Sequence, residues 1–183
     1  MDPIAHSLVG ASLSETPLKR LSVLASPTLV LAANAPDIDI VSAFVGRDLS
    51  LQFRRGWTHG VLAMAILPLL LAGVILLVDR CIASIRRRPP KARFGPTLVL
   101  SYIGVWTHPI LDWLNTYGVR LLMPFDGRWF YGDALFIIDP WVWLLAGAVV
   151  VLANTKSAIS QTTWLIFGIA TTALVTGVSV VPA

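Results

Sequence analysis

Apolar residues dominate this chain in long stretches that are separated by short polar segments. Four stretches approach the length of a membrane-spanning helix: residues 61–78, 96–115, 141–154 and 163–181. A helix needs about 20 apolar residues to cross a bilayer, so the third stretch is short unless its helix begins near Leu135. The last stretch carries no charged residue, which is typical of a lipid-facing helix.

Two shorter apolar stretches, residues 4–13 and 21–35, precede these four. Neither is long enough to span a bilayer, and the polar turn between them predicts a helical hairpin that packs against the longer helices. The pattern therefore predicts an all-α integral membrane helical bundle, with four firm transmembrane helices plus a short N-terminal helical hairpin. A single domain over residues 1–183 is expected.

The composition agrees with a membrane protein. Hydrophobic residues make up 56% of the chain and charged residues 13%, which lies outside the usual range of soluble domains. A single cysteine, Cys81, excludes an intrachain disulfide framework. The net charge of +4 does not predict a nucleic-acid partner, because the cations cluster in a loop that flanks the predicted helices.

The positions of lysine and arginine predict how the helices are oriented. Residues 86–93 include five cations and are expected to be cytoplasmic, because positive charges concentrate on that side of a membrane. The helices on either side of this loop then bring His59 and His108 to the outer end. The N-terminal hairpin, which turns at cytoplasmic Lys19 and Arg20, brings His6 and the turn at residues 36–39 to the same end. A belt of tryptophans is expected at the same level, formed by Trp57, Trp113, Trp129, Trp141 and Trp143.

All three histidines of the chain, His6, His59 and His108, lie near carboxylates at the ends of apolar segments. His108 and Asp112 are four residues apart, so they share one face of a helix. Ionisable groups at membrane depth are costly and indicate function by default. Imidazole with carboxylate is also the donor set of zinc and its first-row neighbours. The alternative is a buried histidine bonded within its own helix turn, but convergence at one depth favours a metal site.

Four further acids are candidates for this site. Asp37 and Asp39 follow a helix-ending proline, and one of them could bind a metal while the other orients a water or a histidine. Asp133 and Asp139 precede the third long apolar stretch and are candidates for a general base or for a group that orients a ligand. The alternative for Asp37 and Asp39 is a solvated interfacial loop.

Arginines accompany the predicted ligands. Arg54 and Arg55 stand shortly before His59, and a planar guanidinium suits a phosphate or a carboxylate of a substrate. Arg128 is a weaker candidate for the same role. The alternative is that these arginines anchor the chain at the membrane interface.

Taken together, these segments resemble the family of LexA-regulated, membrane-bound, metal-dependent hydrolases. The matching pieces are residues 2–7, 36–39, 54–60 and 108–112 and the loop with Asp133 and Asp139. The resemblance implies a hydrolase in the bacterial inner (cytoplasmic) membrane, and it supplies no substrate.

A more distant similarity, to zinc-dependent phospholipase C and its nuclease relatives, implies a ligand set. By that analogy Asp37, His59, His108 and Asp112 hold one metal, and His6 with a bridging Asp112 holds a second. The chain has too few histidines for a three-metal cluster. The similarity therefore implies one or two divalent ions, with Zn²⁺ favoured and Mn²⁺ or Mg²⁺ as alternatives.

We therefore expect a multi-pass membrane hydrolase whose site lies on the outer, periplasmic side. Its expected substrate is a phosphoester of a membrane lipid or another amphiphile. The metal would activate a water, and Asp39 or Asp133 would orient or deprotonate that water. Arg54 and Arg55, with Arg128, would bind the anionic group.

Two other functions remain open from the sequence. One is a transporter or an ion- or proton-conducting protein that uses the same histidines and aspartates. The other is a scaffold in which a metal only holds the helices together. The sequence leaves the oligomeric state unknown.

Overall fold

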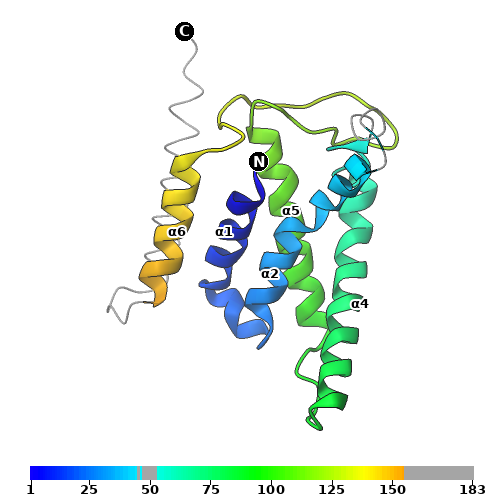
Figure 1. Cartoon of the computed structure of the whole chain (residues 1–183), viewed down its shortest axis with the longest axis vertical. Helices are drawn as coiled ribbons and strands as arrows, with labels where there is room; N and C mark the ends of the chain where they lie inside the picture. Colours follow the sequence, from blue (N-terminus) through cyan, green and yellow to red (C-terminus); the bar gives the residue numbers. More distant parts are fainter. Residues whose placement is uncertain (45, 47–52, 155–183) are drawn as a thin grey trace.

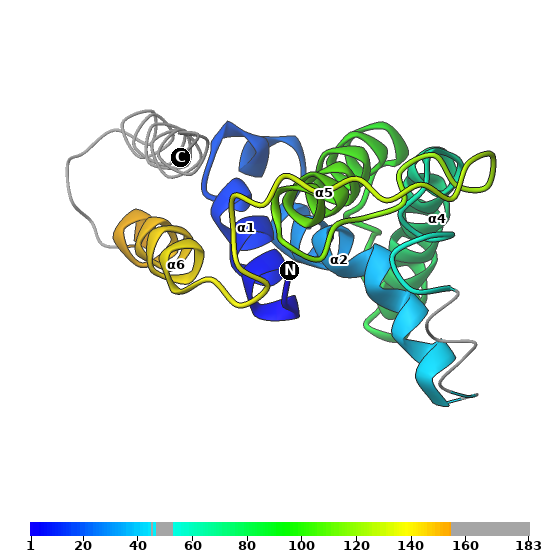
Figure 2. The same ribbon diagram turned by 90° about the horizontal axis from the view of Figure 1, so that it is seen from above.

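The computed structural model describes residues 1–44, 46 and 53–154, which form a helical bundle (Figure 1). Its α-helices and two 3-10 helices are, in chain order, α1 (Pro3–Ser14), η1 (Pro17–Leu21), α2 (Ala25–Asn34), η2 (Ala35–Phe44), α4 (Val61–Ile85), α5 (Phe94–Leu114) and α6 (Pro140–Asn154). Seen from above, α6 and α1 lie on one side of the α2–α5 pair and α4 lies on the other (Figure 2).

The prediction of four firm transmembrane helices is wrong. Among the described residues, α4 alone is long and apolar enough to cross a membrane. α5 has 21 residues, but His108, Asp112 and several glycines and prolines lower its mean hydropathy. α6 is apolar but has 15 residues. The fourth predicted span, residues 163–181, lies outside the described residues.

The polar residues of α5 explain why its hydropathy is low. Thr97, Ser101, His108 and Asp112 are all buried inside the bundle, whereas the outward face carries exposed apolar residues such as Ile110. A helix in the interior of a bundle can therefore have an apolar surface without an apolar composition. Composition averaged along the chain does not separate the two faces.

Glycines let α1 and α5 approach the backbone of α2. A Cβ added at Gly104 of α5 would lie 2.4 Å from the Ala32 Cβ, and one added at Gly10 of α1 would lie 2.8 Å from the Leu29 carbonyl oxygen. Small residues permit such close helix packing inside membranes. His6 and His108 each lie one helical turn from these glycines, and His108 contacts α2 directly, at the Ala33 carbonyl.

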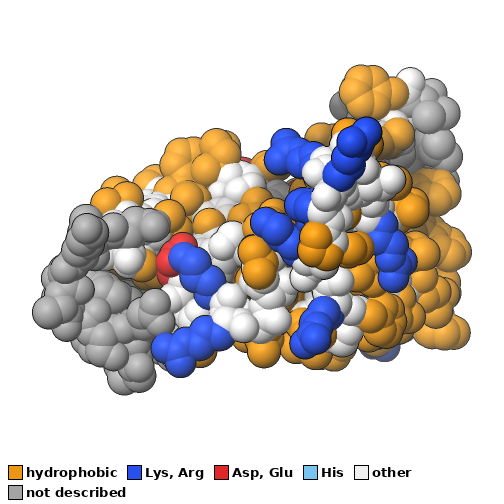
Figure 3. All heavy atoms as spheres, turned by 90° about the horizontal axis from the view of Figure 1, so that it is seen from below, with side chains coloured by type: hydrophobic (Ala, Val, Ile, Leu, Met, Phe, Trp, Pro, Cys, Tyr) orange, Lys and Arg blue, Asp and Glu red, His pale blue; other side chains and the backbone are white. Residues whose placement is uncertain are grey.

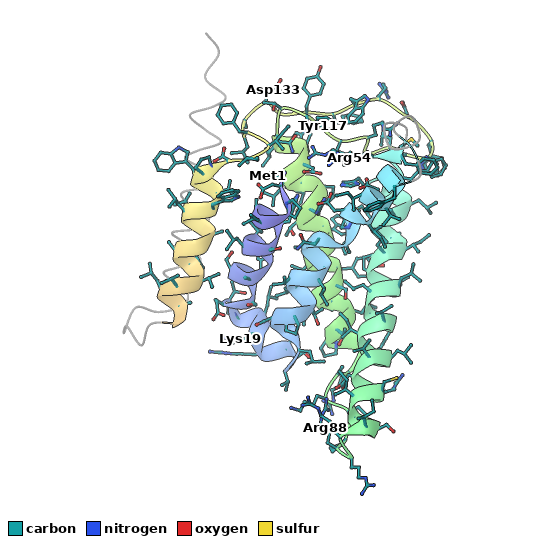
Figure 4. The ribbon with its side chains drawn as sticks, in the orientation of Figure 1. Met1, Lys19, Arg54, Arg88, Tyr117 and Asp133 are labelled. Carbon is teal, nitrogen blue, oxygen red and sulfur yellow. The ribbon has the colours of Figure 1, made fainter. Side chains whose placement is uncertain are left out.

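The two ends of the bundle differ in the charged side chains they carry and in the segments that cover them. Asp79 near the end of α4 accepts hydrogen bonds from Arg88 Nη2 (2.8 Å) and the Ala92 amide (2.7 Å), which closes the turn into α5. Lys19 and Arg88 lie at this lower end, whereas Met1, Arg54, Tyr117 and Asp133 lie at the other (Figure 4). Seen from below, Lys and Arg side chains gather over the lower end (Figure 3).

The upper end is covered by the connection between α5 and α6. Val119 and Phe130 form an antiparallel bridge within it, and the Arg120 amide donates to the Arg55 carbonyl (2.9 Å). The Val61 amide donates to the Leu121 carbonyl (2.9 Å) at the start of α4. This connection therefore holds the segment before α4 against the top of the bundle.

Candidate metal centre

Five of the predicted ligands meet near the upper end of the bundle, where α1, η2, α5 and the segment before α4 converge. We call them the His–Asp cluster: His6, Asp37, His59, His108 and Asp112. Four of them are fully buried, and Asp37 is the exception, with a side chain 25% exposed. Residues separated by up to about a hundred positions thus form one compact group.

The centre of the cluster is a close contact between two imidazoles. His59 Nε2 lies 3.0 Å from His108 Nε2. Asp112 Oδ2 lies 3.3 Å from His59 Nε2 and 3.5 Å from His108 Nε2. Two imidazole nitrogens and one carboxylate oxygen, all of which can bind a metal ion, therefore lie next to one another.

His6 and Asp37 complete the cluster on either side of His108. The His6 ring stacks on the His108 ring with 3.7 Å between centroids, and His6 Nε2 lies 3.5 Å from Asp112 Oδ1. Asp37 Oδ1 lies 3.5 Å from His108 Nε2. Two groups of potential ligands result, His6–His108–Asp112 and Asp37–His59–His108, each with donor atoms within 4.8 Å of one another.

The hydrogen bonds of the two central histidines determine which ring nitrogen carries the proton. His108 Nδ1 lies 2.6 Å from the Ala33 carbonyl oxygen, which can only accept, so Nδ1 is protonated. Thr58 Oγ1 donates to Asp39 (3.2 Å) and therefore accepts from His59 Nδ1 (2.9 Å). Since a neutral imidazole carries one proton, both Nε2 atoms present lone pairs.

These lone pairs fit a bound cation. Two imidazole lone pairs 3.0 Å apart repel each other unless a positive charge lies near both. Asp112 Oδ2 and both ring nitrogens of His6 are also buried without a hydrogen-bond partner among the described residues. Buried polar atoms are nearly always satisfied, and backbone or carboxylate contacts to the far nitrogen are typical of metal-binding histidines. The donor set therefore suits a divalent metal.

Asp39 lies behind His59. Its Oδ2 accepts from the Arg55 amide (2.8 Å) and lies 3.6 Å from His59 Nδ1. Burial raises the pKa of the Asp39 carboxyl, and the hydrogen bond from the Arg55 amide opposes that shift. This predicted catalytic residue therefore orients His59 and does not face the lone pairs.

Arg55 is buried between the cluster and the connection that covers the upper end, although the sequence predicted a substrate-binding role for it. Its guanidinium is buried, donates to Asn115 Oδ1 (3.1 Å) and the Gly118 carbonyl (3.2 Å), and lies over the Tyr117 ring. Its Nη2 is also 3.5 Å from Asp112 Oδ1. In this position Arg55 supports the Asp112 carboxylate from within the protein.

Two supporting groups were missed by the sequence reasoning. Asn115 Nδ2 donates to Asp112 Oδ1 (3.2 Å), and its position three residues after Asp112 was an available signal. The Ala33 carbonyl that orients His108 carries no signal, because any residue supplies a carbonyl. Asp112 Oδ1 also contacts the Met1 nitrogen.

The other predicted residues lie outside the cluster. Asp139 caps α6, since its Oδ1 accepts from the amides of Trp141 (2.9 Å) and Val142 (3.3 Å). Asp133 is exposed in the upper connection. Arg128 is exposed and pairs with Asp126 (2.6 Å). Arg54 is exposed at the upper end, so of the predicted arginines near His59 it is the one open to a ligand.

Comparison with known proteins gives two matches. The family model described as "YdjM inner membrane protein" matches residues 1–182. A relative from Bacillus subtilis (strain 168), "Uncharacterized protein YfhP", is 23% identical over 112 residues, which are 61% of this chain and 31% of that protein. The chain therefore spans about a third of that relative's length. No solved structure matches.

Proposed function

The chain belongs to the YdjM inner membrane protein family, and we propose that it is a metal-dependent hydrolase that cleaves a phosphoester of a lipid or another amphiphile. The observation that carries the proposal is the contact between His59 Nε2 and His108 Nε2 (3.0 Å) beside Asp112 Oδ2, which has no hydrogen-bond partner among the described residues. A site built from imidazole and carboxylate ligands favours Zn²⁺ and can also bind Mn²⁺.

The two ligand groups share His108, whose one free nitrogen binds a single ion, so a second ion would need Asp112 as the bridging ligand. Asp37, His59, His108 and Asp112 would hold the first ion, and His6 with Asp112 would hold a second. A bound divalent cation supplies Lewis acidity, which lowers the pKa of a water ligand and polarises a phosphoryl oxygen.

Neighbouring residues orient the two central histidines, and one side of the cluster is open to a substrate. The Ala33 carbonyl holds the His108 ring, and Asp39 with Thr58 holds the His59 ring. Asp37 is the cluster member with a partly exposed side chain, so the substrate would approach there. Arg54, exposed at the same end, would bind the anionic group through its guanidinium.

The experiment that tests this function is a hydrolysis assay of purified protein in detergent. The protein is loaded with Zn²⁺ or Mn²⁺ and incubated with a panel of phospholipids and a soluble aryl phosphodiester. His108→Ala should abolish turnover while the protein stays folded and membrane-inserted. Thr97→Val is the matched control, because Thr97 is buried on the same helix without a hydrogen-bond partner among the described residues.

Two results would contradict the proposal. One is the absence of turnover with every substrate in metal-loaded protein, and the other is full turnover in His108→Ala. Metal-dependent ion flux into vesicles, with no hydrolysis, would instead favour the transport function that the sequence left open.

A further inference from the structure

An apolar groove of about 250 Å³ lies beside the upper end of α4. One side of it is formed by the first two turns of α4, through Leu62, Ala63, Ile66 and Leu67. Trp57, Thr58 and Pro124 close its upper end, where the connection between α5 and α6 meets the segment before α4 (Figure 1).

The groove opens on the helix that can span the membrane. α4 is the described helix with the length and hydropathy of a span. Of the residues lining the groove, Leu62 is 46% exposed and Ile66 is 43% exposed. An apolar concave surface on this helix faces acyl chains rather than water. Its volume is below the range of about 300–1,000 Å³ typical of small-molecule pockets, so it suits part of a lipid chain.

The upper end of the groove is one hydrogen bond away from the His–Asp cluster. Thr58 lines the groove, and its Oγ1 lies 2.9 Å from His59 Nδ1 and 3.2 Å from Asp39 Oδ2. A molecule that occupies the groove therefore has its upper end next to the residues that orient His59.

Cationic groups lie next to this upper end. The Arg120 guanidinium packs against Gly56, the residue before Trp57, and its Nη2 donates to the Arg54 carbonyl (3.1 Å). It also lies over the Trp129 ring. An apolar groove with guanidinium groups at its upper end is complementary to a molecule with an anionic phosphate above an acyl chain.

We propose that the groove binds one acyl chain of an anionic glycerophospholipid, whose phosphate lies at Arg54 and Arg120. This inference rests on the proposed hydrolase function and names its substrate class. The lipid enters from the bilayer along α4, and its phosphate stays at the level of the cluster. Bulk lipid that merely surrounds α4 would show no such preference for one headgroup or one face.

Photolabelling tests the groove without turnover. Metal-loaded protein is reconstituted in phosphatidylcholine vesicles that contain a trace of phosphatidylglycerol with a diazirine in its acyl chain. After illumination, peptides are mapped by mass spectrometry. We expect labels concentrated on residues 57–67. Labelling should be competed by unlabelled phosphatidylglycerol and not by phosphatidylcholine.

Four variants make the test more specific. Ile66→Trp fills the groove and should reduce labelling about tenfold. This is the discrimination that a small change of size in an apolar pocket typically produces. Leu69→Trp is its matched control, because Leu69 is similarly exposed (46%) on α4 but does not line the groove. Leu62→Trp repeats the test should Ile66→Trp not fold. Arg120→Gln should remove the preference for the anionic lipid.

The outcomes separate this inference from the proposed function. Labels spread evenly over the exposed face of α4, unchanged in Ile66→Trp, would show surrounding lipid only and overturn the groove. Specific labelling in a protein that hydrolyses nothing would sustain the groove as a lipid site and contradict the hydrolase. If both hold, Ile66→Trp should slow hydrolysis of phosphatidylglycerol and leave that of the soluble diester unchanged.

Discussion

Replacing Gly104 by alanine tests whether the close packing of α5 on α2 maintains the geometry of the His–Asp cluster. The added Cβ would lie 2.4 Å from the Ala32 Cβ, whereas carbon atoms pack at about 3.5–4.0 Å. The helices must therefore separate by about 1 Å at this level. His108 lies one turn further along α5, with Nδ1 2.6 Å from the Ala33 carbonyl oxygen. An extra 1 Å, roughly, takes that contact beyond hydrogen-bond range.

The expected consequences are both structural and functional. Overpacking of this kind costs about 1–3 kcal/mol of unfolding free energy. Loss of a group that orients a metal ligand lowers metal affinity by about 10–100-fold. Gly104→Ala should therefore unfold at a lower temperature and bind Zn²⁺ more weakly than the wild type.

Gly95→Ala is the matched control, because it makes the same substitution on the same helix. A Cβ added at Gly95 meets nothing within 4 Å, so this variant should keep the stability and metal affinity of the wild type. Thermal unfolding in detergent and competition with a chelating dye measure the two properties. If Gly104→Ala matched Gly95→Ala in both, the proposed role of the helix contact would be refuted.

Three further variants separate the roles of the aspartates. Asp139→Ala should cost about 1 kcal/mol of stability, since it removes the cap of α6, and elemental analysis should find its metal content unchanged. Asp39→Asn should weaken metal binding by about 10–100-fold without abolishing it; wild-type affinity in a chelator competition would argue against its role behind His59. Asp79→Ala should lower the unfolding free energy, because it removes the acceptor of the hydrogen bonds that close the α4–α5 turn, while metal content per folded chain should not change.

The sequence predicted the five residues of the His–Asp cluster but not the backbone carbonyl that orients His108. The spacing of His108 and Asp112 places them on one helix face. The basic loop predicted that His59 lies at the same end, and the hairpin turn at Lys19 and Arg20 predicted the same of Asp37. The orientation of the His108 ring depends on the Ala33 carbonyl, and that of the Asp112 carboxylate depends on Asn115. Every residue has a backbone carbonyl, so the sequence could not predict which carbonyl orients His108.

Two local patterns in the sequence indicate structures that differ from those predicted. Asp139 precedes a proline, as Asp2 does, and both carboxylates cap the helix that follows. An aspartate before a proline at a helix start is a standard capping pattern. α5 was predicted as a firm span from its apolar residues. Its buried polar face, which includes Ser101, lowers the hydropathy that such a prediction depends on.

The central claim is that the His–Asp cluster binds a divalent cation, and the most direct test is the metal content of purified protein. Wild-type protein and Thr97→Val, reconstituted with Zn²⁺ or Mn²⁺ and desalted, should each retain about one or two ions per chain. His108→Ala and Asp112→Ala should retain none, or far less. Equal metal content in all four proteins, or no bound metal in the wild type after reconstitution with each ion, would contradict the account.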